Sequence, residues 1–112
     1  MRKERPNLLQ PAIDKFISRE EKALKAIRDS SINYLEVGIF GSYARNDYNM
    51  RSDIDILVVI PEYEITDEMS ILRERLDISK VQVVYSTPDV FTGTSLFDRE
   101  IQRDYIRKMK RN

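Results

Sequence analysis

Two short groups of residues in this sequence could do chemistry: Gly41-Ser42, and the aspartates Asp53 and Asp55. Side chains alternate along a strand, so aspartates two residues apart project from one face of it. Two carboxylates so close together repel each other unless a cation or a proton lies between them. Mg²⁺ takes oxygen ligands and usually keeps some coordination positions for substrate phosphates. The pair is therefore a candidate site for Mg²⁺ or Mn²⁺.

Gly41-Ser42 is the complementary half of such a site. Glycine allows the backbone to approach a ligand closely, and serine adds a hydroxyl and the N–H groups of a helix start, which together bind anions. Each group also has a plainer explanation: a strand-to-helix turn with a serine cap, and solvated aspartates at the start of a strand. Because both groups occur together, directly before the apolar run 56–60, a nucleoside triphosphate site is favoured.

Composition excludes several other chemistries. The 112 residues include neither His nor Cys, which excludes the usual zinc sites, Ser-His-Asp triads and thiol catalysis. The three glycines do not fit the dinucleotide or P-loop fingerprints. Nineteen basic and nineteen acidic residues give no net charge, which disfavours nucleic-acid binding. No apolar run is long enough for a membrane, and no secretory signal follows residues 1–6, so we expect a cytoplasmic protein.

The apolar pattern predicts the element order α-β-α-β-α-β-α. Apolar residues at steps of three and four predict helices, and β-branched runs that end at Gly or Pro predict strands. Ser42 and Thr66 are suited to cap two of the helices. The expected helices cover residues 11–30, 41–45, 66–76 and 95–110, the expected strands cover 35–40, 52–60 and 81–85, and 46–51 is an expected loop. No repeat or linker interrupts the pattern, which indicates one α+β domain over residues 1–112.

Two further features have a plain and a functional interpretation. Arg99, Arg103 and Arg107 recur every four residues on the last expected helix. Such a stripe is usually a solvated helix face, and the alternative is a docking strip for RNA or an acidic partner.

Tyr43 and Tyr48 flank the predicted nucleotide site. Most simply they belong to the core or its rim, and the alternative is stacking on a base.

The segment GSYARNDYNMRSDIDILVV resembles the core motif of the minimal nucleotidyltransferases of the DNA polymerase β superfamily. That motif consists of Gly-Ser, a loop of about ten residues and Asp-x-Asp in an apolar strand, and the resemblance extends over nearly the whole chain. It implies a small mixed β-sheet flanked by helices. It also implies that Gly41 and Ser42 hold the β- and γ-phosphates, that Arg45 meets the triphosphate, and that Asp53 and Asp55 bind Mg²⁺ or Mn²⁺ for in-line displacement at phosphorus.

The sequence departs from the family pattern at two positions. Asn46 stands where the family has Gly, a mild change because Asn also tolerates positive φ. Gln82 stands where a third carboxylate is expected on the following strand. A neutral amide oxygen brings no charge, so the ion that activates the attacking hydroxyl should be held weakly. Asp77 and Asp89 flank this strand and are candidate substitutes, although neither has the expected register.

By resemblance, the chain is expected to transfer a nucleoside monophosphate, in the first place AMP from ATP, to an acceptor hydroxyl. Family members of this size are often antitoxins paired with a HEPN-domain toxin, and some adenylylate that toxin. The alternative is a catalytically weakened nucleotide-binding or interaction protein, which Gln82 favours. An RNA-directed transferase is disfavoured, because the chain contains no separate RNA-binding domain.

Overall fold

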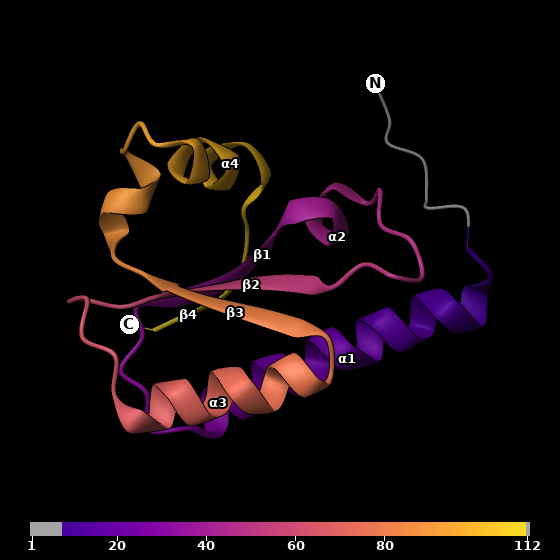
Figure 1. Ribbon diagram of the computed structural model, residues 1–112, viewed down its shortest axis with the longest axis horizontal. Coiled ribbons are helices and arrows are strands. Elements are labelled where there is room, and N and C mark those ends of the chain that lie inside the picture. Colours follow the sequence, from indigo (N-terminus) through magenta and orange to yellow (C-terminus); the bar gives the residue numbers. More distant parts are fainter. Residues whose placement is uncertain (1–7, 112) are drawn as a thin grey trace.

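The computed structural model describes residues 8–111, which form a four-stranded mixed sheet with helices on both faces (Figure 1). The order across the sheet is β3-β2-β1-β4; β1 is antiparallel to both of its neighbours, and β2 and β3 are parallel. The strands are β1 (Glu36–Phe40), β2 (Ile54–Val59), β3 (Val81–Ser86) and β4 (Ile106–Lys110). The helices are α1 (Gln10–Asp29), α2 (Gly41–Arg45), α3 (Asp67–Ile78), the 3₁₀ turn η1 (Pro88–Phe91) and α4 (Leu96–Asp104). The mixed α+β architecture is confirmed.

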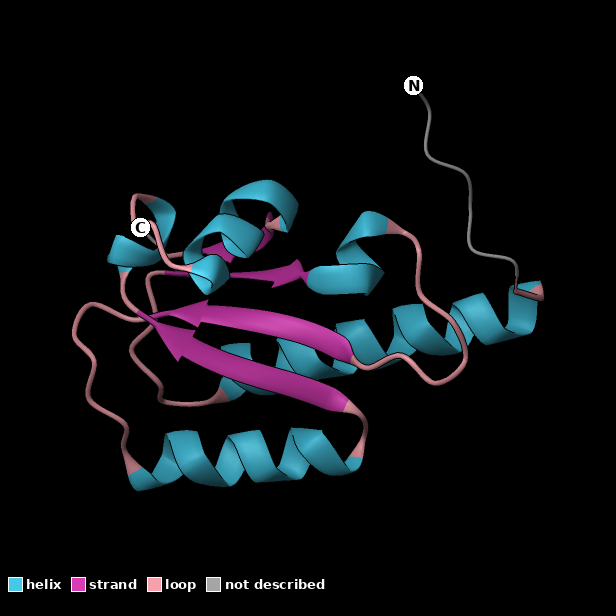
Figure 2. Ribbon diagram, turned by 45° about the horizontal axis from the view of Figure 1, so that its top comes forward, coloured by secondary structure: helices cyan, strands magenta, loops and turns pink. Residues whose placement is uncertain are grey.

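The sheet separates two apolar clusters of side chains. The two views show helices on either side of the sheet (Figures 1 and 2). Ile54, Ile56 and Val58 of β2 face α1 and α3, whereas Leu57 and Val59 face α4 and η1. This alternation follows from the period of two along a strand. Because both faces of β2 are covered, its residues form one continuous apolar run instead of alternating with polar ones. The face that carries Leu57 also carries Asp55, two residues earlier.

The expected helices at the beginning and the middle of the chain are confirmed. α1 buries Phe16, Ala23 and Ile27 against the sheet, which matches the spacing of its apolar residues. Thr66 is the N-cap of α3, and its hydroxyl accepts a hydrogen bond from the Met69 N–H at 3.3 Å. The strand expected over 52–60 is shorter at both ends, so Asp53 directly precedes β2.

The predicted final helix over 95–110 is wrong beyond Asp104. α4 ends there, Tyr105 adopts an extended backbone, and the following residues form β4 along the open edge of β1. The ladder pairs Ile39 with Ile106 and gives the edge of β1 backbone partners. Gly38 makes this possible, because a Cβ there would overlap the Tyr105 ring and the Ile106 carbonyl. The element order therefore gains a fourth strand.

This correction also removes the arginine stripe. Arg99 and Arg103 lie on α4, whereas Arg107 lies on β4. The three arginines therefore do not form one helix face, and Arg103 forms a 2.8 Å ion pair with Asp104.

Residues 1–6, in which the sequence shows no secretory signal, lie outside the described part of the chain. Within residues 8–111, no helix has the length and apolar composition of a membrane span.

Candidate active site

Gly41 and Asp55 meet at the point where β1 passes into α2. In the β1–β2 ladder, Asp55 lies directly opposite Phe40, the residue before Gly41. Gly41 has a φ of +75°, and a Cβ at this position would overlap a carboxylate oxygen of Asp55. Only glycine accepts both this backbone conformation and this close approach. The local fold thus places backbone without a side chain against the Asp55 carboxylate and brings the two groups of the motif together.

The predicted cap by Ser42 is wrong. The N-cap position of α2 is Phe40, which makes no side-chain capping bond, and Ser42 is the second residue of the helix. β1 ends at Phe40 and α2 begins at Gly41, so Ser42 lies inside the helix, beyond the N-cap position. Its side chain is half-buried beside Gly41, and its hydroxyl makes no hydrogen bond to another residue in 8–111. Whether it binds phosphate stays a prediction.

Asp53 and Asp55 are both half-buried at the beginning of β2. Burial, the charge of Glu100 and the charge of Asp53 raise the pKa of Asp55 from 3.8 to about 6, and the nearby Arg45 opposes the shift. The ionised form of Asp55 is therefore only partly compensated, by the charge of Arg45. A cation beside Asp55 would relieve this repulsion.

Gln82 is the register neighbour of Asp55 in the parallel β2–β3 ladder. Residues paired in this way project from the same face of a sheet, so the amide lies beside the carboxylate, on the face covered by α4. Asp77 lies on α3, which covers the opposite face. Asp89 lies in η1, which follows the far end of β3. Asp77 lines one pocket together with Gln82, but neither aspartate shares the strand register that pairs Gln82 with Asp55.

Arg45 links α2 to α4. Its guanidinium donates to Asp104 at 2.7 Å and to Asp47 at 3.2 Å. The Asp104 side chain is only 1% exposed, and hydrogen bonds from Arg103 and Arg45 hold its pKa below the usual range. Arg45 is thus already engaged as a structural tether, and a contact between Arg45 and a triphosphate stays a prediction.

Comparison with known proteins is consistent with this geometry. The sequence model of the nucleotidyltransferase domain matches residues 20–109, which include every predicted site residue. The chain belongs to the nucleotidyltransferase domain family.

Two relatives of the chain are informative. A Methanocaldococcus jannaschii protein, provisionally named a protein adenylyltransferase, is 33% identical over 69 residues, which are 61% of this chain and 64% of that protein. The chain thus spans less than two thirds of the length of this relative. A crystal structure of a provisionally named nucleotidyltransferase from Sulfolobus solfataricus is 27% identical, with a TM-score of 0.64 over 94% of this chain and 92% of the other.

The charge of Glu100 acts on Asp55 in the candidate site, an influence that sequence reasoning missed. Glu100 lies on α4, and its charge acts on Asp55 more strongly than that of Asp53. It lies three residues after Phe97 and four residues before Asp104, so these three residues share one side of α4. That spacing was the available signal, but nothing in the sequence pattern assigns Glu100 to the site.

The tyrosines that flank the motif belong to the core. Tyr43 and Tyr48 have ring centroids 4.9 Å apart, and Tyr48 lies 4.5 Å from the ring of Phe16. Tyr43 stacks on the same phenylalanine at 6.0 Å. These contacts point toward α1, away from Asp55, so the plainer interpretation is confirmed and stacking on a nucleotide base is not supported.

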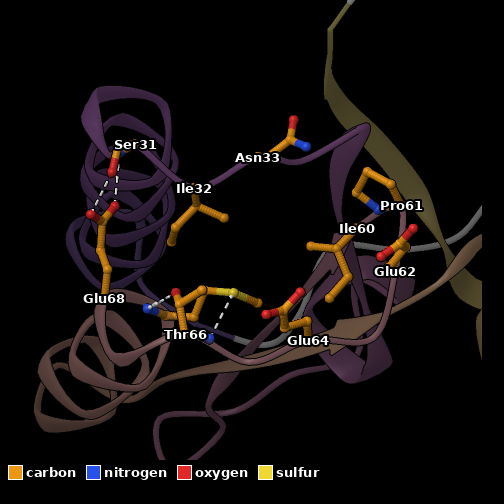
Figure 3. A pocket seen from close by; sticks show the side chains of 10 residues that line it. Ser31, Ile32, Asn33, Ile60, Pro61, Glu62, Glu64, Thr66 and Glu68 are labelled. Atoms are coloured by element: carbon orange, nitrogen blue, oxygen red, sulfur yellow. Dashed lines mark hydrogen bonds between the residues drawn. The ribbon is translucent and has the colours of Figure 1, made fainter.

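A cavity of about 600 Å³ lies at the opposite end of β2 (Figure 3). There Glu68 accepts hydrogen bonds from the backbone N–H and the hydroxyl of Ser31, at 2.8 and 2.5 Å. None of the predicted site residues lines it. The lining residues are Ser31, Ile32, Asn33, Ile60, Pro61, Glu62, Glu64, Thr66, Glu68 and Met69.

The donor set suits an ion that is shared with a substrate. Among residues 8–111, no three acidic side chains converge closely enough to hold a metal by themselves. Asp53 and Asp55 offer carboxylate oxygens, and Gln82 adds a neutral oxygen. Mg²⁺ typically binds through one or two carboxylates and completes its coordination with water and substrate phosphates. The residues therefore fit Mg²⁺ or Mn²⁺ bound together with a nucleoside triphosphate.

Proposed function

We propose that the chain is a metal-dependent nucleotidyltransferase that transfers AMP from ATP to an acceptor hydroxyl. One observation carries the proposal: the side-chain-free backbone at Gly41 lies against the carboxylate of Asp55, beside Asp53. Close backbone approach suits a phosphate chain, and the carboxylates suit its metal ion. Membership of the nucleotidyltransferase family supports the reaction class.

In the proposed reaction, the acceptor oxygen forms a bond to the α-phosphorus of ATP. The bond from that phosphorus to the bridging oxygen breaks, pyrophosphate leaves, and the acceptor proton is lost to water. Asp53 and Asp55 would hold Mg²⁺, which when bound neutralises charge on the triphosphate. The backbone at Gly41 and the hydroxyl of Ser42 would hold the β- and γ-phosphates. Arg45, which is close enough to lower the pKa of Asp55, would add positive charge.

The acceptor that we propose is a hydroxyl of a partner protein. The provisional name of the Methanocaldococcus jannaschii relative, a protein adenylyltransferase, supports this acceptor class. A HEPN-domain toxin is the expected partner from the resemblance described above, and the cytoplasm is the expected compartment. A direct check is incubation of the chain with the candidate partner and α-labelled ATP, followed by detection of label on the partner.

The nucleotide site can be tested without knowledge of the acceptor. We expect calorimetric titration with ATP to show binding in the presence of Mg²⁺ and little without it. Asp53→Asn should abolish the metal-dependent component. Asp67→Asn, on α3 at the opposite face of the sheet, is the matched control and should bind like the native chain. No binding of any nucleoside triphosphate at millimolar concentration would refute the proposal.

Gln82 favours a second candidate function, a nucleotide-binding interaction protein with weak or no transfer. The amide stands in register with Asp55 but brings no charge to the ion on the nucleophile side. In that case ATP binds and transfer is slow or absent. Gln82→Asp separates the two functions: a large gain in transfer indicates a weakened enzyme, whereas unchanged nucleotide binding without transfer in both forms indicates a binding protein.

A further inference from the structure

A basic groove lies between α1 and α3, on the face of the sheet opposite α4. The two helices contact each other and lie side by side on this face (Figure 1). A cavity of about 620 Å³ opens between them, and we call it the α1–α3 groove. Its cationic lining consists of Lys15, Arg19 and Lys22 from α1 and Arg75 from α3. The described residues place no acidic side chain in this lining.

The four cations are not neutralised by other residues in 8–111. All ion pairs in this part of the chain are formed by other basic side chains. The guanidinium of Arg19 lies 4.9 Å from the centre of the Phe16 ring, which orients it without removing its charge. Lys15, Arg19 and Lys22 follow one another at steps of four and three, so they form a row about 10 Å long on one side of α1.

The groove also has an apolar part. Ala23 is buried in the core, and Ala26 and Leu76 pack against that core, whereas Ile78 is 86% exposed. Exposed apolar side chains beside polar ones are typical of protein interaction surfaces. Among the described residues, no aromatic side chain lines the groove, so it lacks a stacking surface for the bases of single-stranded RNA. The lining therefore favours a protein segment over a nucleic acid.

The groove lies at the same end of the sheet as the candidate site. Val81, the first residue of β3, lines the groove and pairs with Ile54 in the β2–β3 ladder. Ile54 stands between Asp53 and Asp55 in the sequence. Because β2 and β3 are parallel, both strands begin at this end. A segment bound in the groove would therefore extend to the end of the sheet that carries the two aspartates.

We propose that the α1–α3 groove docks an acidic, amphipathic segment of the partner protein that receives AMP. This inference rests on the proposed function, in which the acceptor hydroxyl belongs to a partner protein. Carboxylates at helical steps of three and four match the spacing of the cation row, and apolar side chains on the adjoining face cover the apolar lining. Docking here holds the acceptor protein close to the site of transfer.

The probe is a fluorescein-labelled helical peptide with glutamates at steps of four and three and leucines on the adjoining face. Fluorescence anisotropy should show binding to the native chain that weakens as the salt concentration rises. Lys22→Gln combined with Arg75→Gln should weaken binding about tenfold, because two exposed ion pairs are lost. Arg107→Gln combined with Lys110→Gln, on β4, is the matched control, which removes the same charge outside the groove and should bind like the native chain. Circular dichroism shows whether each variant is folded.

Several results would overturn the role of the groove. Absence of peptide binding, or equal weakening by both double variants, would do so, because the effect would then not be local to the groove. Tighter binding of a single-stranded RNA, lost with the same two substitutions in the groove, would assign this surface to nucleic acid. A dimer in sedimentation equilibrium that dissociates in the groove variant would assign it to a second copy of the chain.

Calorimetric titration with ATP and Mg²⁺ separates this proposal from the proposed function. The variant with Lys22→Gln and Arg75→Gln should bind ATP like the native chain, because neither residue belongs to the candidate nucleotide site. If the native chain binds the peptide but no nucleoside triphosphate, the proposed function fails and the groove remains a docking surface. If it binds ATP but not the peptide, the groove proposal alone fails.

Discussion

The carboxylate of Asp55 should make the ligand-free protein less stable at neutral pH than its amide variant. In the folded protein its pKa is about 6, against 3.8 for an ordinary Asp. Between these pH values the folded state binds more protons than the unfolded state, so the free energy of unfolding falls as pH rises from about 4 to 6. Above pH 6 the decrease in the free energy of unfolding is complete, and this contribution no longer changes with pH. Asp55→Asn removes this titration while keeping the shape of the side chain.

The expected magnitude follows from the shift of about two pKa units. Each unit corresponds to about 1.4 kcal/mol, which gives an upper limit of about 3 kcal/mol. Because the side chain is half-buried, solvent screening reduces this to about 2 kcal/mol. For a chain of this length, such a difference raises the melting temperature by about 8 °C. Asp55→Asn should therefore be more stable than the native chain at pH 7.5 and lose most of that advantage near pH 4.

Urea denaturation at pH 4, 5, 6 and 7.5 measures the effect. Asp77→Asn, an exposed aspartate on α3, is the control and should differ from native by only a few tenths of a kcal/mol. Adding Mg²⁺ and ATP should stabilise the native chain and not Asp55→Asn. The reasoning is refuted if Asp55→Asn is less stable than native at pH 7.5, or if the difference does not change with pH.

Three further outcomes follow from the same geometry. Gly41→Ala should lower the free energy of unfolding by at least about 2 kcal/mol, because the added Cβ overlaps the Asp55 carboxylate and the backbone has a positive φ. Equal stability of the two proteins in urea would contradict this close approach. Arg45→Ala should lower the free energy of unfolding by about 2 kcal/mol, because the buried Asp104 then keeps only the guanidinium of Arg103. Arg45→Lys should recover only part of this stability in thermal melting, because lysine lacks the forked donor of arginine. Mn²⁺ affinity should fall about tenfold from pH 7.5 to pH 5, because protons compete for Asp55, and a flat profile in calorimetry would argue against a metal on this residue.

The motif and most elements were predictable because they are local in sequence. Thr66 caps α3, and the apolar run in β2 is a strand, since capping and burial patterns depend on neighbouring residues. The close approach of Gly41 to the Asp55 carboxylate could also be predicted, because a tight strand-to-helix turn followed by a second strand permits few backbone arrangements. The serine cap was not, because the N-cap of α2 is Phe40, two residues before Ser42.

The end of the chain shows why local pattern is insufficient. Phe97, Ile101, Tyr105 and Met109 recur at steps of four, which fits one long helix. In the fold, the first two positions belong to α4, and Met109 belongs to β4, where it pairs with Val37. The deciding factor is the open edge of β1, which lies about seventy residues earlier in the chain. Its unpaired N–H and C=O groups gain more from a strand than residues 106–110 gain from a longer helix.

The same break in the helix explains why the influence of Glu100 on Asp55 could not be predicted from the sequence. On a helix that continued to residue 110, the apolar and basic positions would divide into two faces, and Glu100 would accompany the arginines. Because α4 stops at Asp104, its orientation is set by Ile101 in the core and by the Arg45–Asp104 ion pair. With α4 held in this way, the charge of Glu100 acts on Asp55, which is the register neighbour of Gln82. A strand register can be read from sequence, but the rotation of a helix over a sheet depends on partners far away in the chain.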